Sequence, residues 1–295
     1  MLVLKILLKL YLEVQALRKI RVLVYEKPSD AYWNLAVEEA IPRAVAIQKA
    51  PPTLRFFRNE NAVIIGVFQY AEKEVNLEYA LKNDVQIVRR FTGGGAVYHD
   101  MGNLNYALSL PFSEFNVPKD IIEYYSFFLN PLVSALKKLG FENVSKGLLN
   151  DIELNKRKVG GSAGSTKWNI AFFHGTLLVS TDIDRLSNVL KVPRVKLSDK
   201  GVPSVKKRVI NLSSVRPDIS QEEIIEEIIK SYSEHLNAEV YEGELGEEER
   251  KIAEALYNVK YSRREWNLER LNPLIADSEV EKILRKTVLS KWKSG

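Results

Sequence analysis

The sequence predicts an α+β fold in which helices pack on a mixed, mostly antiparallel sheet. A chain of 295 residues is long enough to bury a sizeable core, as one large domain with or without a small appendage. Short β-rich runs mix with hairpin turns and helical segments, and they do not alternate strictly with helices as in a doubly wound sheet. The sequence shows no internal repeat and no low-complexity tract. These observations favour a single principal α+β domain.

The first half of the chain is expected to hold short strands and one helix. Pro28, Ser29 and Asp30 form a fair helix start, and the segment after them predicts a helix over residues 31–40. Asn59-Glu60-Asn61 provides a turn between two β-rich runs. Strands are expected at residues 21–25, 54–57, 62–67, 85–88 and 104–110.

The second half alternates helices with a hairpin and a further strand. Residues 117–139 predict a helix that starts at Pro118, stops at Gly140 and is kinked or divided by Pro131. Residues 151–154 and 157–160 predict a hairpin, and residues 171–179 a strand followed by a short helix. The next helix begins at Ser220, where a Glu three residues later completes a capping box. Its apolar stripe comprises Ile224, Ile225, Ile228, Ile229 and Tyr232.

Composition and charge exclude several classes of function. The formal charge of +5 and the pI of about 9.1 suit an anionic ligand or an acidic partner, but they are too weak to indicate nucleic acid. The chain has no cysteine, which excludes disulfides, thiolate metal sites and a thiol nucleophile. Lys5 and Lys9 interrupt the apolar first residues, so these predict neither a signal peptide nor a membrane span. Residues 191–216 are basic, and the acidic residues 218–254 are interpreted as solvated surface.

A glycine-rich turn next to two arginines is the first candidate site. Arg89 and Arg90 end a strand-like run, and Gly93-Gly94-Gly95 remove every side chain from the following turn. Glycines in a row are unfavourable unless the backbone needs positive φ or a close approach to another group. Backbone N–H groups beside a guanidinium suit an anionic ligand. The alternative is an ordinary tight hairpin with solvent-facing arginines.

A second basic turn strengthens the first. Asn150-Asp151 precede Lys158, which is followed by Gly160 and Gly161. A strand lysine held near Arg90 would add a second fixed cation, and the two together would neutralise a carboxylate and a phosphate that must approach each other. The alternative is a solvated surface lysine.

Other motifs are weaker. No Walker P-loop is present, because Lys167 follows Thr166 and not glycine. His99-Asp100 do not suggest a catalytic triad, since adjacent strand residues point to opposite faces. Three histidines without cysteine do not favour a structural zinc site. His174, within an apolar strand, is either a core histidine or a site residue.

The segment from Arg90 through Gly93, Gly94, Gly95 and His99 to Asn103 resembles the signature of lipoate–protein ligases. Further segments resemble the same family in the family's order: residues 33–39, 150–151, 157–163, 173–178, 200–205 and 208–212. The resemblance runs from about Arg21 to about Asn267. It implies the catalytic fold shared by biotin– and lipoate–protein ligases. It also implies that lipoate and Mg-ATP give lipoyl-AMP, whose acyl group passes to a lysine amine of a lipoyl domain.

The resemblance also implies roles for individual residues. Lys158 is expected to be catalytic and to contact both the nucleotide and the lipoyl group. Mg²⁺ is expected to bind together with ATP, and no residue of the chain alone is expected to be a metal ligand. The expected ATP or adenylate contacts are Arg90, Gly95, Ala96, Val97, Tyr98, Asn150, Asp151 and Lys158. The expected lipoyl contacts are Gly93, Gly94, Gly95, Lys158 and His174. The expected adenylate loop comprises Lys196, Lys200, Gly201, Val202, Ser204 and Val205. Because the lipoyl tail is apolar, Phe91, Tyr98, Val63 and Ile65 are expected to line its channel.

The expected organisation is an N-terminal extension (1–20), a catalytic domain (21–267) and a short tail (268–295). Larger members of the family carry a C-terminal accessory domain, and the tail is too short to form one. The resemblance therefore implies a two-protein type, in which a separate accessory protein assists activation. The expected acceptors are apo lipoyl domains, in acyltransferase subunits of 2-oxoacid dehydrogenases and in the glycine-cleavage H protein. A cytoplasmic location without membrane or nucleic-acid partners is expected.

Two alternatives remain open. An octanoyl transferase of the same superfamily would take its acyl group from acyl carrier protein, but such enzymes use a cysteine that this chain lacks. A non-catalytic subunit would bind lipoyl-adenylate and modify nothing. The preference between lipoate and octanoate is also open.

Overall fold

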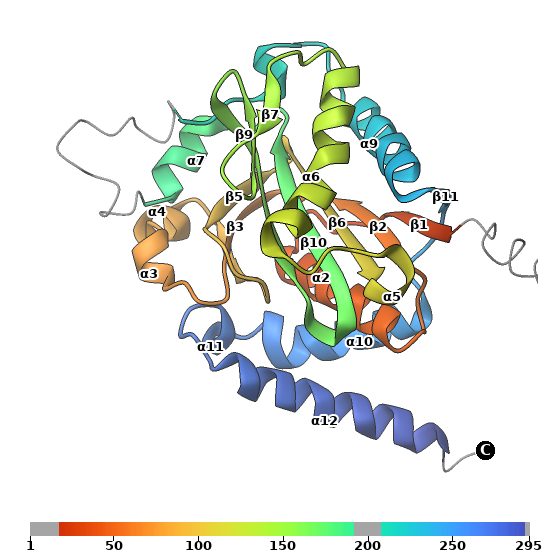
Figure 1. Cartoon of the computed structure of the whole chain (residues 1–295). Coiled ribbons are helices and arrows are strands. Elements are labelled where there is room, and N and C mark those ends of the chain that lie inside the picture. Colours follow the sequence, from red (N-terminus) through yellow and green to blue (C-terminus); the bar gives the residue numbers. More distant parts are fainter. Residues whose placement is uncertain (1–17, 192–207, 293–295) are drawn as a thin grey trace, which may run out of the picture.

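The computed structural model describes residues 18–191 and 208–292, and it contains two sheets (Figure 1). The strand order is β11-β1-β2-β6-β10-β9-β8-β7 in the large sheet and β4-β3-β5 in the small one. The strands are β1 (Arg18–Val24), β2 (Thr53–Phe57), β3 (Asn61–Ile65), β4 (Gln86–Arg89), β5 (Val97–Asp100), β6 (Asn103–Pro111), β7 (Val144–Lys146), β8 (Asp151–Leu154), β9 (Arg157–Ser165), β10 (Ile170–Leu178) and β11 (Ala238–Glu242). β1 pairs in parallel with β11 and β2, and β3 with β4, while the other strand pairs are antiparallel. The predicted α+β class with a mostly antiparallel mixed sheet is confirmed.

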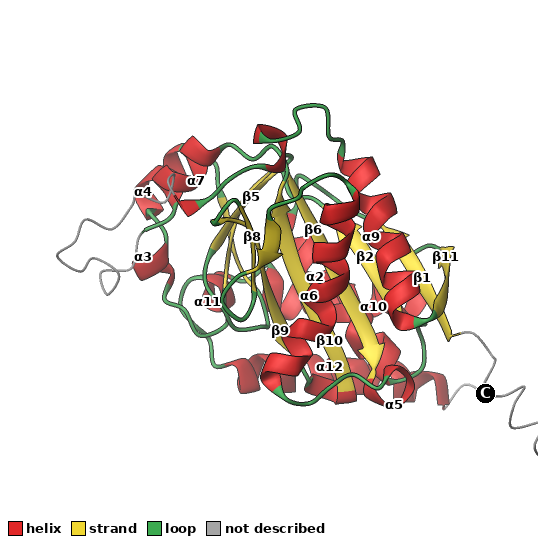
Figure 2. Cartoon of the chain, turned by 45° about the horizontal axis from the view of Figure 1, so that its top comes forward, coloured by secondary structure: helices red, strands yellow, loops and turns green. Residues whose placement is uncertain are grey.

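Helices cover both faces of the large sheet. α6 (Ile121–Lys138) and α9 (Gln221–Leu236) lie on one face, and α2 (Ala31–Ala46) and α10 (Glu247–Leu256) on the other (Figure 2). The remaining helices are α3 (Ala71–Glu74), α4 (Leu77–Lys82), α5 (Phe112–Phe115), α7 (Ile183–Val189), α11 (Arg264–Asn267) and α12 (Pro273–Trp292), with short turns η1 (Lys167–Asn169), η3 (Leu212–Ser214) and η4 (Tyr257–Tyr261). Each face therefore has its own apolar core. Among the described residues, no helix has the length and apolar character needed to cross a membrane.

Most predicted elements are present, and the largest difference concerns α6. This helix begins at Ile121 and not at Pro118, because the Asp120 carboxylate accepts hydrogen bonds from the backbone N–H groups of Ile122 and Glu123. The helix also runs through Pro131 without being divided. Pro131 is buried, and its packing offsets the loss of one backbone hydrogen bond.

The hairpin of β8 and β9 is confirmed. Asn155 and Lys156 have φ values of +52° and +61°, which is the geometry of a tight two-residue turn between twisted strands. This turn sets the register in which Asp151 pairs with Gly161. A β-bulge lies between Ile152 and Glu153, so the pairing shifts along the hairpin. The hairpin therefore determines which side chains of β8 and β9 face the same side.

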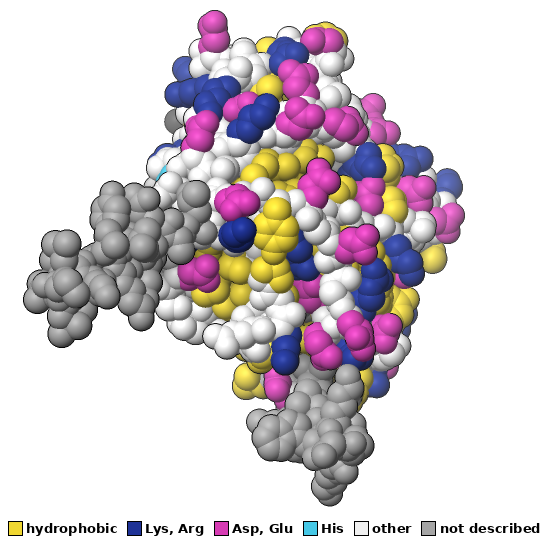
Figure 3. Space-filling model, turned by 90° about the vertical axis from the view of Figure 1, so that its right-hand side faces the viewer, with side chains coloured by type: hydrophobic (Ala, Val, Ile, Leu, Met, Phe, Trp, Pro, Cys, Tyr) yellow, Lys and Arg dark blue, Asp and Glu magenta, His cyan; other side chains and the backbone are white. Residues whose placement is uncertain are grey.

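The acidic stretch after residue 218 is only partly solvated surface. Acidic and basic side chains are interspersed over the face that carries α9 (Figure 3). Glu249 is an exception, since its side chain is 1% exposed and forms an ion pair of 2.5 Å with the buried Arg21. The interpretation of the whole stretch as solvated surface was therefore wrong at this residue, because Arg21 of β1 supplies a buried partner.

A buried ionic cluster joins α2 to the C-terminal helices. The Glu39 carboxylate accepts hydrogen bonds from Lys260, Tyr261 and Arg43. Burial alone would raise the pKa of Glu39, but the charges of Lys260 and Arg43 outweigh it and lower the pKa to about 2. Asp277 of α12 binds Arg43 and Lys260 as well. The last described helix is thus fixed to the domain through charges on α2 and η4.

Candidate functional site

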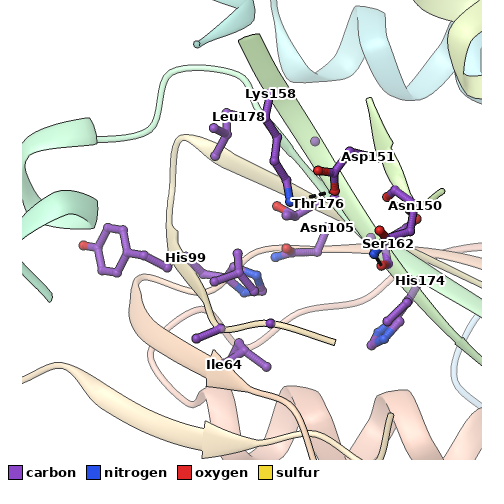
Figure 4. Close-up of a pocket in the computed structure, with 18 of the residues that line it drawn as sticks. Ile64, His99, Asn105, Asn150, Asp151, Lys158, Ser162, His174, Thr176 and Leu178 are labelled. Atoms are coloured by element: carbon purple, nitrogen blue, oxygen red, sulfur yellow. Dashed lines mark hydrogen bonds and ion pairs between the residues drawn. The ribbon is translucent and has the colours of Figure 1, made fainter. Parts of the chain in front are cut away.

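A cavity lies between the large sheet, the small sheet and α2. Its volume is about 630 Å³. The large sheet contributes side chains from β6, β8, β9 and β10, the small sheet from β3 and β5, and α2 contributes Leu35 and Glu38. Figure 4 shows side chains of the two sheets, from Ile64 to Leu178, converging from strands that are far apart in the sequence. The size suits a ligand larger than a single amino acid.

The glycine-rich turn forms one wall of the cavity, and Arg90 holds it. The guanidinium donates to the backbone oxygens of Gly93 and Gly95, with its Nη2 2.9 Å from the Gly95 oxygen. Gly94 has a φ of +93°, and a Cβ there would lie 2.7 Å from Nη2 of Arg90, so only glycine fits. Burial lowers the pKa of Arg90 to about 10, which leaves it charged at neutral pH. The turn is therefore built around a buried cation.

The two neighbouring arginines have different surroundings, and both are buried. Arg89 donates to the backbone oxygens of Trp266 and Asn267 as well as to the chain after β3. It therefore fixes the C-terminal part of the domain to the small sheet. Arg90 is 5% exposed and lines the cavity. The alternative of a hairpin with solvent-facing arginines is wrong, because both guanidinium groups are buried and donate hydrogen bonds to backbone oxygens.

Lys158 lies on β9 and lines the same cavity. Its Nζ is 2.7 Å from Oδ1 of Asp151, and its side chain is 44% exposed (Figure 4). A Cβ on Gly161 would lie 2.8 Å from this Nζ, so the lysine side chain extends over the bare backbone of Gly161. The Asp151 carboxylate thus holds the ammonium, and the missing side chain of Gly161 leaves room for it.

His174 belongs to the site and is also hydrogen-bonded as a core histidine would be. Its Nδ1 is 2.8 Å from Oε1 of Glu38, and its Nε2 is 2.7 Å from Oγ1 of Thr92. Arg90 donates to the same Thr92 oxygen, so the threonine hydroxyl is free to donate to Nε2. The Nδ1–H then donates to Glu38. This chain of hydrogen bonds couples α2, the glycine turn and β10.

His99 is not part of a catalytic triad among the described residues. The Asn59 amide lies 3.0 Å from its Nδ1. Burial, reinforced by the nearby charge of Arg90, lowers the pKa of His99 to about 3, so the ring is neutral at physiological pH. The sequence argument against a triad at this position is consistent with a ring that contributes a neutral, buried wall to the cavity.

The structure brings most of the predicted site residues to one cavity. Those that line it are Arg90, Gly95, Ala96, Val97, Tyr98, Asn150, Asp151, Lys158 and His174. Gly93 and Gly94 lie in the same turn, where they interact with Arg90. The predicted adenylate loop, Lys196 to Val205, lies outside the described residues, but Leu190 and Arg208 on its two sides line the cavity.

The predicted channel walls need a correction. Tyr98 borders the cavity, but its side chain packs with Val63 and Ile65 in the core of the small sheet. Their neighbour Ile64 lines the cavity instead, because successive strand residues point to opposite faces. Phe91 packs on Phe172, with ring centroids 4.9 Å apart.

Sequence reasoning gave no role to three polar residues of the cavity. Glu38, Asn105 and Thr176 all line it, and all are less than a tenth exposed. The available signal was a polar residue at alternate positions of an otherwise apolar strand, as in Asn103-Leu104-Asn105 and His174-Gly175-Thr176. A period of two places such residues on one face.

The cavity can therefore hold an anionic ligand with an apolar part. Arg90 and Lys158 supply positive charge to its lining, and Leu35, Phe57 and Ile64 supply apolar surface. Within residues 18–191 and 208–292, no three His, Asp or Glu side chains are grouped to hold a metal ion.

Comparisons with known proteins show to which family the chain belongs. The sequence model of the lipoyl protein ligase A/B catalytic domain matches residues 30–233. Lipoate-protein ligase A subunit 1 of Thermoplasma acidophilum is 37% identical over 258 residues, which is 84% of this chain and 96% of that protein. Octanoyltransferase LipM of Brevibacillus brevis is 31% identical over 275 residues, 85% of this chain and 99% of that protein.

Solved structures give the same result. The chain of the bi-partite lipoate protein ligase of T. acidophilum, solved in a study of that ligase and its E2 lipoyl domain, has a TM-score of 0.76 and 36% identity, over 86% of this chain and 98% of that one. A lipoate-protein ligase A bound with ATP has a TM-score of 0.75 and 35% identity, over 86% of this chain and all of that one. From the family match over more than half of its length, together with these relatives, the chain belongs to the lipoyl protein ligase A/B catalytic-domain family.

Proposed function

We propose that this chain attaches lipoate to a specific lysine of lipoyl domains through a lipoyl-AMP intermediate. The observation that carries the proposal is the cavity lined both by the turn that Arg90 holds and by Lys158. The family membership and the ATP-bound relative support a nucleotide in this place. Apolar surface at Leu35, Phe57 and Ile64 suits the hydrocarbon part of lipoate.

In the activation step, a lipoate carboxylate oxygen bonds to the α-phosphorus of ATP while the bond to the β-phosphate oxygen breaks and pyrophosphate leaves. The two reacting groups are both anionic and repel each other. Lys158 and the backbone amides of the glycine turn would reduce this repulsion, since the backbone oxygens of that turn already face Arg90. Mg²⁺ would arrive bound to the phosphates of ATP and supply further positive charge.

In the transfer step, the amine of the acceptor lysine bonds to the acyl carbon and releases one proton to water, and the carbon–oxygen bond to AMP breaks with its electron pair leaving on AMP. Lys158 would hold the acyl oxygen and the leaving phosphate in place. Asp151, 2.7 Å from Nζ, orients this ammonium and leaves its other hydrogens free for the ligand.

We also propose that activation depends on a separate accessory protein. The support is the likeness to subunit 1 of a bi-partite ligase, almost all of whose length this chain matches. The purified chain should then transfer from preformed lipoyl-AMP and activate free lipoate poorly.

The decisive experiment is a mass measurement on an apo lipoyl domain. One reaction contains synthetic lipoyl-AMP, a second contains lipoate with MgATP, and a third adds a candidate accessory protein to the second. Modification in the first and third reactions, with little in the second, is expected. An unmodified domain in the first reaction would refute the ligase function and leave a carrier of lipoyl-adenylate. Full ATP–pyrophosphate exchange by the chain alone would refute the need for a partner.

Octanoyl transfer from acyl carrier protein is the second candidate, and the likeness to octanoyltransferase LipM favours it. The absence of cysteine from this chain opposes it, because an acyl thioester intermediate on the enzyme then cannot form. Octanoyl-acyl carrier protein offered to the same lipoyl domain without ATP separates the two functions, since only the transferase modifies the domain.

A further inference from the structure

Asn105 stands out as a buried amide without a partner. It lies on β6, it is 2% exposed, and it lines the cavity beside Thr176 (Figure 4). Neither its Nδ2 nor its Oδ1 has a hydrogen-bond partner among the described residues. Buried amides are nearly always hydrogen-bonded, because losing their contacts with water is unfavourable. A leucine of similar volume would fill the same place without that cost.

Asn103, on the same strand and the same face, shows what a structural asparagine looks like here. Its Nδ2 donates to the Tyr98 backbone oxygen and to Oγ1 of Thr176, and its Oδ1 accepts from the Thr181 hydroxyl. Its amide is therefore fully used inside the protein. Asn105, two residues further along, offers an unpaired amide NH2 group and an unpaired carbonyl oxygen to the cavity instead.

The strand register places Asn105 near Lys158. Gly161 of β9 pairs with Thr176 of β10, and Thr176 pairs with Asn105 of β6. The Lys158 ammonium extends over Gly161. Two strand spacings, about 10 Å, therefore separate the backbone under the ammonium from the backbone of Asn105. A group that contacts both side chains must lie above Thr176.

We propose that Asn105 binds the reacting carbonyl of the acyl group, with its Nδ2 donating to the carbonyl oxygen and its Oδ1 accepting from the attacking amine. This inference rests on the proposed function. The acyl chain itself is apolar and its dithiolane sulfurs are weak acceptors, so the carboxyl end is the part that satisfies an amide. During transfer, the amine nitrogen bonds to the acyl carbon and releases one proton to water, and AMP leaves with the electron pair of the broken carbon–oxygen bond. Asn105 orients both groups and takes up no proton.

The test is single-turnover transfer from saturating lipoyl-AMP to an apo lipoyl domain. Asn105→Leu should lower the rate constant about a hundredfold, as expected for removal of one donor to a developing oxyanion. Its melting temperature should equal or exceed that of the wild type, because no intramolecular hydrogen bond is lost. Asn105→Asp keeps the size and the acceptor but loses the donor, and it should be slow as well.

Ser231→Ala is the matched control. Ser231 on α9 also has a buried side-chain oxygen without a partner among the described residues, and it lies outside the cavity lining. This variant should transfer at the wild-type rate.

Each outcome decides the assignment. Transfer by Asn105→Leu within about threefold of wild type would overturn it, and so would a higher KM for lipoyl-AMP with an unchanged rate at saturation. A clear loss of melting temperature in both Asn105 variants would assign the residue to the structure instead. Failure of the wild-type chain to transfer would refute the proposed function and not this inference alone.

Discussion

Replacing Lys158 by alanine tests whether this residue contributes to the rate of acyl transfer and not to the stability of the fold. The ion pair with Asp151 has side chains that are 44% and 27% exposed, and such partly exposed pairs contribute about 0–1 kcal/mol to the free energy of unfolding. The melting temperature of the variant should therefore fall by less than about 4 °C. The loss of a cation directed at the reacting groups should instead slow transfer from lipoyl-AMP by a factor of about 100–1,000.

The matched control is Lys167→Ala. Lys167 pairs with Asp277 at 2.9 Å, and its side chain is 43% exposed, but it lies outside the cavity lining. Both variants should thus show similar small losses in melting temperature, and only Lys158→Ala should lose transfer in the single-turnover assay. Equal transfer rates in the two variants would refute the role of Lys158. A large fall in melting temperature in Lys158→Ala alone would refute the reasoning about its exposure.

Three further predictions follow from the same contacts. Arg90→Lys should reduce the rate of transfer and lower the free energy of unfolding by about 2 kcal/mol. The reason is that an ammonium cannot replace a guanidinium that donates to several backbone oxygens at once. An unchanged urea unfolding curve would contradict this. Gly161→Ala should slow transfer without a measurable change in melting temperature, because the new Cβ would displace only the flexible end of Lys158; wild-type transfer would show that the position of the ammonium is not needed. Glu39 has a pKa of about 2, since the charge of Lys260 helps to outweigh the effect of burial, so its carboxylate stabilises the fold above about pH 4.5 and loses that contribution as the pH falls toward 2. Glu39→Gln should therefore lower the free energy of unfolding at pH 7 by about 3 kcal/mol and weaken its dependence on pH in that interval, and parallel pH curves for variant and wild type would contradict this.

Local patterns in the sequence predicted most of the elements. Alternating apolar residues, an N-cap at Ser220 and a two-residue turn at Asn155-Lys156 act over a few residues, so they can be recognised without the rest of the chain. Of the predicted capping box only the Ser220 half forms, because the Glu223 carboxylate binds Arg216 instead. The N-terminus of α6 was misplaced because two start signals, Pro118 and Asp120, compete within three residues. Only the coordinates distinguish them.

The candidate site was predicted as two motifs, and the tertiary structure decided how they meet. The glycine turn and Lys158 are recognisable because their residue types are unusual for ordinary strands and turns. The side of β3 that faces the cavity was not predictable, so Val63 and Ile65 were chosen where Ile64 lines it.

By itself, the sequence determined the fold class, the two basic glycine motifs and the exclusion of thiol chemistry. Tertiary structure decided that Arg90 binds the backbone oxygens of its own turn, that Lys158 extends over Gly161, and that Asn105 has no partner among the described residues. The physical reason is the distance along the chain over which each interaction acts. Turn and strand preferences depend on neighbouring residues, whereas the pairing of a donor with an acceptor depends on the register between strands that are distant in the chain.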